Sequence, residues 1–141
     1  MLSDAMNELI NKIQNQGKMS FLEGASDAQI DEFEKEKNIK LPRLYREWLT
    51  YSDGGEFYLP AGVQFYGVLH KPIIDVDDSD RPNENYVVIG ALATGDPILF
   101  EKNSEKISIY NHGAGVIETD EIYDDFYAFL NDLENILGIG E

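Results

Sequence analysis

Residues 75–80 (DVDDSD) place side-chain oxygens at the first, third and fifth positions, the spacing with which a calcium-binding loop begins. The pattern does not continue. The sixth position is Asp80, where such a loop requires glycine, and the twelfth is Tyr86, where a bidentate glutamate should complete the coordination shell. We therefore interpret this segment as part of an exposed acidic loop, residues 71–85, and not as a metal site.

The two histidines, His70 and His112, lie in no motif that binds a metal or activates a nucleophile. No serine lies in the strand-to-helix elbow of a hydrolase, and the chain has no cysteine, which excludes disulfides, thiolate metal sites and cysteine nucleophiles. No Walker loop is present, and residues 113–115 (GAG) lack the third glycine and the following helix of a dinucleotide-binding turn. We therefore expect no catalysis, no cofactor and no metal.

Charge is the most informative property of the composition. The chain has 27 acidic residues against 11 lysines and arginines, a formal net charge of −16. Residues 1–70 hold 7 bases and 11 acids, and residues 71–141 hold 4 bases and 16 acids, so the net charges are −4 and −12. Such a surface repels nucleic acid and anionic lipid and attracts a basic partner, although the same charge would also serve solubility alone. We expect neither nucleic acid nor a membrane as a partner.

Length and composition predict one globular domain over residues 1–141, because 43% of the residues are hydrophobic and 27% are charged. The first ten residues, MLSDAMNELI, lack the basic region and the apolar run of a signal peptide. No stretch is apolar for long enough to span a bilayer. These features predict a cytoplasmic protein, and they carry no indication of its oligomeric state.

Apolar residues at helical spacing predict three helices in the first third of the chain, over residues 2–16, 26–38 and 42–52. The second should begin with a capping box between Ser26 and Gln29. Pro42 suits the first position of the third helix, since its missing N–H would have no partner there. Gly54 and Gly55 can adopt the left-handed backbone that closes the same helix.

After residue 55 the pattern changes to short strands separated by turn residues, at 56–59, 63–69, 86–89, 98–101, 107–110 and 116–118. Residues 102–106 and 111–115 suit the reversals between the last three strands. Apolar residues from Ile122 to Leu137 then predict a closing helix that ends at Gly138 and carries Asp120, Glu121, Asp124 and Asp125 at its start. This order defines an α+β fold with an antiparallel sheet.

The same residues resemble a known family. Ile30-x-x-x-Glu34, then Ile39-x-Leu41-Pro42-x-x-Tyr45-x-x-Trp48-Leu49, then Asp53-Gly54-Gly55 are similar to the opening signature of the SUKH superfamily, also called the Smi-one/Knr-four family. Ile89-Gly90, Gly95-Asp96, the strand at 107–110 and Phe126-x-x-Phe129-Leu130 stand where that family has its second set of landmarks. The resemblance spans residues 5–137. Asp53 stands where asparagine is commoner in the family, and Trp48 where phenylalanine is common.

The resemblance implies a compact α+β domain in which helices pack on a curved antiparallel sheet. It also implies that the motif residues form a scaffold and not an active site. In this interpretation the residues from Leu41 to Leu49 seat the third helix on the sheet, and residues 53–55 start the first strand. The structural motif comprises Glu34, Leu41, Pro42, Tyr45, Trp48, Leu49, Asp53, Gly54, Gly55, Gly90, Gly95 and Asp96.

Bacterial members similar to this chain are chiefly immunity proteins, which bind and neutralise a cognate polymorphic toxin, often a nuclease. The resemblance therefore implies a non-catalytic immunity protein, and the acidic surface is compatible with a basic toxin that grips phosphate. We predict that the contacts include Asp75, Asp77, Asp78, Asp80 and Glu84 in the acidic loop. A second group consists of Asp120, Glu121, Asp124 and Asp125.

Two other functions stay open on the sequence. The fungal relatives suggest a housekeeping interaction module that recruits a signalling or cell-envelope enzyme. A hydrolase that uses a pair of carboxylates is the second, although 27 acids offer so many pairs that none can be singled out. A non-toxic resident partner would favour the first, and turnover lost with one carboxylate would favour the second.

Overall fold

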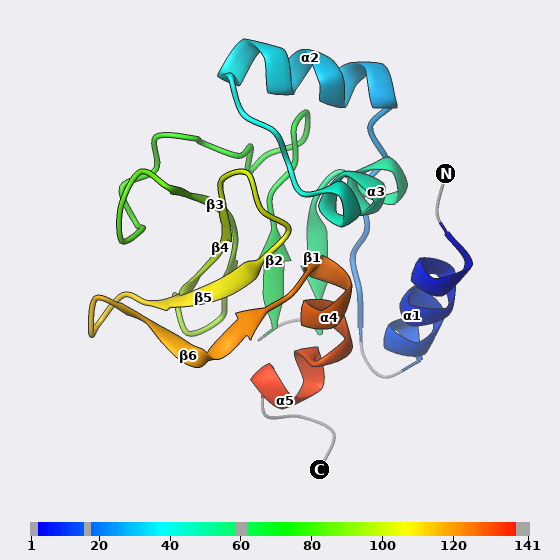
Figure 1. The fold of residues 1–141 in the computed structure, drawn as a ribbon. Helices are drawn as coiled ribbons and strands as arrows, with labels where there is room; N and C mark the ends of the chain where they lie inside the picture. Colours follow the sequence, from blue (N-terminus) through cyan, green and yellow to red (C-terminus); the bar gives the residue numbers. More distant parts are fainter. Residues whose placement is uncertain (1–2, 16–17, 59–61, 138–141) are drawn as a thin grey trace.

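The computed structural model describes residues 3–15, 18–58 and 62–137, and these form an α+β fold (Figure 1). The helices are α1 (Asp4–Gln14), α2 (Asp27–Lys37), α3 (Arg43–Tyr51), α4 (Phe126–Asn131) and α5 (Leu133–Leu137). The strands are β1 (Gly55–Phe57), β2 (Val63–Phe65), β3 (Tyr86–Leu92), β4 (Pro97–Glu101), β5 (Ile107–Asn111) and β6 (Val116–Tyr123). Helices at both ends of the chain thus enclose a run of strands, as the sequence predicted.

The described strands form one antiparallel sheet in the order β1-β2-β3-β4-β5-β6, so each strand pairs with its neighbours in sequence. Irregular pairing occurs between Val88 and Gly90 of β3 and between Ser108 and Tyr110 of β5, where the strands bend. Ser20 forms an isolated bridge with Glu56 and so covers the outer edge of β1. β6 forms the other edge of the sheet.

The second helix begins and ends as the sequence indicated, whereas α1 begins two residues later and ends two residues earlier than the predicted range 2–16. The side chain of Ser3 caps α1 by accepting the N–H of Met6. In α2 the hydroxyl of Ser26 accepts the N–H of Gln29, and the Gln29 side chain accepts the N–H of Ser26, so the predicted capping box is confirmed. Asn38 ends α2 in the left-handed conformation, with φ 56°.

Each end of α3 differs from the prediction by one residue. Pro42 precedes the first helical residue and occupies the N-cap position, with an extended ψ of 140°. The helix ends at Tyr51, and its C-cap residue Ser52 is already extended. Gly54 and Gly55 have the positive φ that was expected, 102° and 112°, but they turn the chain into β1 and do not close the helix.

The prediction for the last helix was wrong at its start. β6 continues to Tyr123, because Ile122 pairs with Ser108 and Tyr123 pairs with Ile107. Asp120 and Glu121 therefore lie in a strand. The helix begins only at Phe126, with Asp125 as its N-cap, and it divides into α4 and α5 at Asp132. Gly138, the predicted stop, lies outside the described residues.

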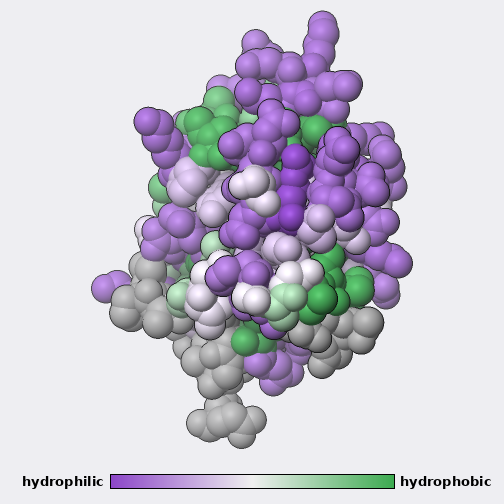
Figure 2. All heavy atoms as spheres, turned by 90° about the vertical axis from the view of Figure 1, so that its left-hand side faces the viewer, coloured by the Kyte–Doolittle hydropathy of each residue, from purple (hydrophilic) through white to green (hydrophobic). Residues whose placement is uncertain are grey.

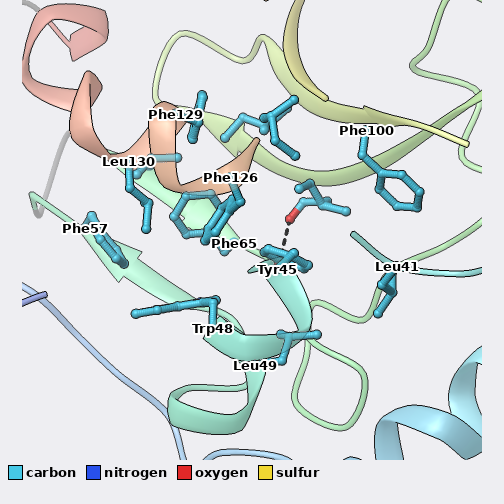
Figure 3. Close-up of a cluster of buried hydrophobic side chains, with 14 of the residues drawn as sticks. Leu41, Tyr45, Trp48, Leu49, Phe57, Phe65, Phe100, Phe126, Phe129 and Leu130 are labelled. Carbon is cyan, nitrogen blue, oxygen red and sulfur yellow. Dashed lines mark hydrogen bonds between the residues drawn. The ribbon is translucent and has the colours of Figure 1, made fainter. Parts of the chain in front are cut away.

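The core lies between one face of the sheet and the helices α1, α3 and α4 (Figures 1 and 3). Aromatic rings join these layers. Tyr45 of α3 makes an edge-to-face contact with Phe126 of α4, with centroids 4.9 Å apart, and Trp48 makes one with Phe57 of β1 at 5.2 Å. Both Tyr45 and Trp48 are fully buried, so they serve the core and not a surface for stacking bases or sugars.

No helix in the described part of the chain is long and apolar enough to cross a membrane.

Candidate partner-binding surface

The acidic loop, residues 71–85, belongs to the long connection between β2 and β3 (Figure 1). It contains five acids and two bases, Lys71 and Arg81, so its formal charge is −3. Figure 2 shows the side of the molecule on which the loop lies in Figure 1, and hydrophilic residues cover most of this face. The loop thus presents acidic side chains on a largely polar surface.

The start of the loop is fixed by a buried carboxylate. Asp53 is fully buried, and its oxygens accept the backbone N–H groups of Val68, Leu69 and His70, each at 2.7 Å. The ring nitrogen Nδ1 of His70 lies 3.0 Å from Oδ2 of the same carboxylate. Three backbone donors satisfy a charge that would be costly to bury alone, and in return they fix residues 68–70. A residue of the structural motif therefore positions the chain just before the acidic loop.

Two backbone contacts then seat the first part of the loop. Gly67 and Ile73 form a parallel bridge, in which the N–H of Gly67 donates to the carbonyl of Pro72 and the N–H of Ile74 donates to the carbonyl of Gly67. The side chain of Ile74 is 1% exposed and belongs to the core. The loop is thus attached to the domain by an apolar side chain directly before its first acid, Asp75.

Arg81 holds the second part of the loop. Its Nη1 atom donates to the carbonyls of Val76 and Tyr86, both at 2.9 Å. Because Tyr86 is the first residue of β3, this one guanidinium connects the middle of the loop to the sheet. A planar cation with several donors can hold two carbonyls in fixed positions, which a lysine ammonium does less well.

The loop acids shape the backbone locally and still face outward. Oδ1 of Asp75 accepts the N–H of Asp77, and Oδ1 of Asp78 accepts the N–H of Asp80, both at 2.9 Å. Asp75, Asp77, Asp80 and Glu84 are exposed, and Asp78 is half-buried. Among the described residues, none of these five carboxylates forms an ion pair. The structure therefore brings the first predicted group together in one folded loop, with its charges available.

The phenol of Tyr66 lies within the electrostatic reach of this loop. Burial raises the pKa of Tyr66, and the carboxylates of Asp78 and Asp80 raise it further. No sequence pattern indicated that this tyrosine would lie near the acids. The negative charge of Asp78 and Asp80 therefore reaches this phenol, directly after β2.

The second predicted group of acids lies elsewhere and is divided. It follows β5 and precedes α4, and β6 is separated from the strand after the acidic loop, β3, by β4 and β5. Asp125 is used as the cap of α4, where its Oδ1 accepts the N–H of Ala128 at 2.8 Å. Asp124 is exposed, and Asp120 and Glu121 lie in β6. The two predicted groups of acids therefore lie on different segments of the fold, one in the acidic loop and the other in β6 and the start of α4.

The residues of the structural motif lie in and around the core. Glu34 joins α2 to α3, because Oε2 accepts the N–H of Leu41 at 2.6 Å and Oε1 pairs with Arg46. Tyr45 donates to the carbonyls of Tyr66 and Ile89, and the dashed line in Figure 3 marks a hydrogen bond of Tyr45. Trp48 donates to the carbonyl of Gly54 at 3.0 Å. Leu41, Pro42, Leu49, Gly54, Gly55 and Gly90 are buried, and Gly95 and Asp96 belong to the turn before β4.

The arrangement offers no reactive centre of a familiar kind within the described residues. Neither histidine is paired with a nucleophile: His70 contacts Asp53, and Nδ1 of His112 lies 2.7 Å from Oδ1 of Asp96. No group of three metal-ligating side chains that could hold an ion occurs in the described part of the chain. What the geometry provides is an acidic loop whose backbone is held by contacts of Asp53, Ile74 and Arg81.

The fold is that of a small α+β domain. The chain belongs to the SMI1/KNR4 family (SUKH-1), whose family model matches residues 24–132. The match begins before α2, includes the whole sheet and α4, and so covers more than half of the chain. A search of curated proteins gave no match.

Proposed function

We propose that this protein is an immunity protein, which binds a basic protein toxin, such as a nuclease, and neutralises it by stoichiometric contact. Membership in the SUKH-1 family is consistent with an immunity-type protein. The observation that carries the proposal is the acidic loop, whose outward-facing carboxylates are unpaired within the described structure while its backbone is held in place.

Such a loop suits rapid binding of a cationic surface. A net charge of −16 attracts a basic protein over long distances, and unpaired carboxylates at the surface add short-range complementarity. Because Asp53, Ile74 and Arg81 fix the loop in advance, less conformational entropy is lost on binding than for a disordered acidic segment. The loop would fill the phosphate-binding cleft of a nuclease and so block its substrate.

The first experiment is a pull-down from the native host with this protein as bait, washed with increasing salt and analysed by mass spectrometry. We expect a basic protein that is toxic when it is expressed alone, and we expect it to elute as salt rises. Recovery of only a resident, non-toxic enzyme would contradict the proposal and would support a housekeeping interaction module instead.

The second experiment places the contact on the loop. The triple variant Asp77→Asn, Asp78→Asn and Asp80→Asn removes three charges and keeps the side-chain oxygen that accepts the N–H of residue 80. We expect association with the captured toxin at low salt to be slower by about tenfold, and the salt dependence to become weaker.

A matched control removes three exposed charges from the helices, with Glu8→Gln, Glu32→Gln and Glu36→Gln. Both triple variants change the net charge by the same amount, so the difference between them reports position and not total charge. An unchanged association rate in the loop variant, or an equal loss in both variants, would contradict the role of the loop.

A further inference from the structure

A groove of about 690 Å³ lies between the α2–α3 connection and the β4–β5 turn, and a hollow of about 320 Å³ adjoins it. Lys40 and Asn103 line both, so the two hollows adjoin and together form the cationic groove. Its lining carries a formal charge of +2, in a chain whose net charge is −16. The charged lining residues are four cations and two acids: Lys40, Arg43, Arg46, Lys102, Glu34 and Glu105.

Both acids of the groove are already engaged in the fold. Glu34 accepts the N–H of Leu41 and pairs with Arg46. Glu105, from the β4–β5 turn, accepts the backbone N–H of Arg43 at 2.9 Å and so caps the first turn of α3. Arg46 is likewise engaged, since its Nη1 atom also lies 2.8 Å from Oδ1 of Asp31.

The other three cations are available. Within the part of the chain that the structure describes, the side chains of Lys40, Arg43 and Lys102 form no ion pair. Lys40 and Arg43 are exposed, and Lys102 is half-buried. In a protein with more than twice as many acids as bases, three unpaired cations around one groove are an unexpected concentration of positive charge.

We propose that the cationic groove is a docking site for an extended, acidic segment of a protein partner. The charge of the lining fits carboxylate side chains, and two adjoining hollows of about 690 and 320 Å³ have room for several residues of a peptide and are far larger than a single ion needs. Asn38 and Asn103 add neutral amides, which can hydrogen-bond a peptide backbone.

The groove begins where the acidic loop ends, because the N–H of Lys102 donates to the carbonyl of Asn85 at 2.7 Å. A partner that covers both surfaces must present positive charge to the loop and negative charge to the groove. This combination would discriminate among basic proteins that bear no acidic segment. Only this extension rests on the proposed function, and the docking site itself does not.

The test is a titration of the ¹⁵N-labelled protein with a synthetic, end-blocked peptide of alternating glutamate and glycine, followed by NMR. We expect shift changes at residues 38–43 and 102–105. The triple variant Lys40→Gln, Arg43→Gln and Lys102→Gln should bind the peptide at least about tenfold more weakly. A control with Lys12→Gln, Lys18→Gln and Lys71→Gln removes the same charge outside the groove and should retain wild-type affinity, provided that both variants remain folded.

The absence of shifts in the groove would overturn the proposal, as would equal weakening in both triple variants or equal binding of a glutamine–glycine peptide. A concentration-dependent increase in sedimentation of the wild type that the groove variant abolishes would assign the groove to a second copy and would also overturn it. Because the probe is a peptide and not a toxin, this result is independent of the pull-down.

Discussion

Oδ2 of Asp53 lies 2.7 Å from the backbone nitrogen of His70 and 3.0 Å from Nδ1 of the same residue. Asp53 follows α3, in the structural motif, whereas His70 directly precedes the acidic loop. A single buried carboxylate therefore connects the scaffold to the candidate partner-binding surface. Gly67 lies against this carboxylate so closely that a Cβ atom there would lie 2.7 Å from Oδ1, which leaves the chain little freedom at this point.

We expect Asp53→Asn to lower the free energy of unfolding by about 1–3 kcal/mol. The amide nitrogen of asparagine would replace a carboxylate oxygen that accepts backbone N–H groups in the wild type, and a donor would then face a donor. Urea unfolding measures the change. Hydrogen exchange should show the loss of protection first at Val68, Leu69 and His70.

Asp96→Asn is the matched control, since Asp96 also contacts a histidine but at the surface. An exposed pair contributes little, so we expect a change within about 0.5 kcal/mol. Equal stability of Asp53→Asn and wild type would show that the three backbone contacts do not fix the start of the loop.

The sequence predicted most of the scaffold and only part of the surface. Helical spacing and the capping box located α2, since these signals are local, and the resemblance indicated the curved sheet. The end of β6 was missed because Ile122 and Tyr123 fit both a helical spacing and a strand, and only their pairing with Ser108 and Ile107 decides between them. Strand pairing over long distances in sequence overrides local pattern.

Local sequence pattern also could not predict the contacts between residues that are far apart in the chain. Asp53 was expected only to help start the first strand, yet its carboxylate also accepts backbone N–H groups from residues 68–70. Arg81 belongs to no recognisable motif. It anchors the loop because it donates to the carbonyl of Tyr86, which is the first residue of β3. The cationic groove joins Lys40 to Lys102 across the fold.

We expect Gly90→Ala to lower the free energy of unfolding by about 1–3 kcal/mol, because its Cβ would lie 2.5 Å from the carbonyl oxygen of Gln64. That oxygen belongs to the neighbouring strand, so relief requires β2 and β3 to separate locally. Thermal unfolding would measure the effect. Gly113→Ala is the control, since its Cβ would meet only Oδ1 of Asn111, at an ordinary 3.6 Å. A stable Gly90→Ala variant would contradict the close approach of β2 to β3.

Arg81→Met should loosen the acidic loop while the core stays folded. The change leaves the carbonyls of Val76 and Tyr86 without their donor, and we expect faster cleavage of residues 71–85 by an added protease, together with faster amide exchange there. Arg81→Lys keeps the charge but not the planar guanidinium, so it should give an intermediate result.

Lys71→Met is the control. It alters an exposed cation of the same loop and should leave cleavage unchanged. Unaltered cleavage in Arg81→Met would mean that the backbone contacts at Gly67 hold the loop alone.

Alkaline pH should destabilise the protein through Tyr45. Burial raises the pKa of this phenol well above its ordinary value, and the nearby charge of Asp53 raises it further. The folded state therefore keeps the Tyr45 proton at a pH at which the unfolded chain has released it. The resulting stability is fully present below pH about 10 and is lost as the pH rises beyond that value toward the raised pKa of the folded state.

Tyr45→Phe separates this effect from simple loss of contacts. At pH 7 the variant loses the hydrogen bonds to the carbonyls of Tyr66 and Ile89, so we expect it to be less stable by about 1–2 kcal/mol. Above pH 10 the stability of the wild type should fall more steeply than that of the variant, by up to about 1.4 kcal/mol per pH unit for one proton. Urea unfolding between pH 7 and 11 measures both curves, with the surface variant Tyr51→Phe as the control. Parallel curves for wild type and Tyr45→Phe above pH 10 would show that another group governs alkaline unfolding, with Tyr66, whose pKa is also raised, as the next residue to test.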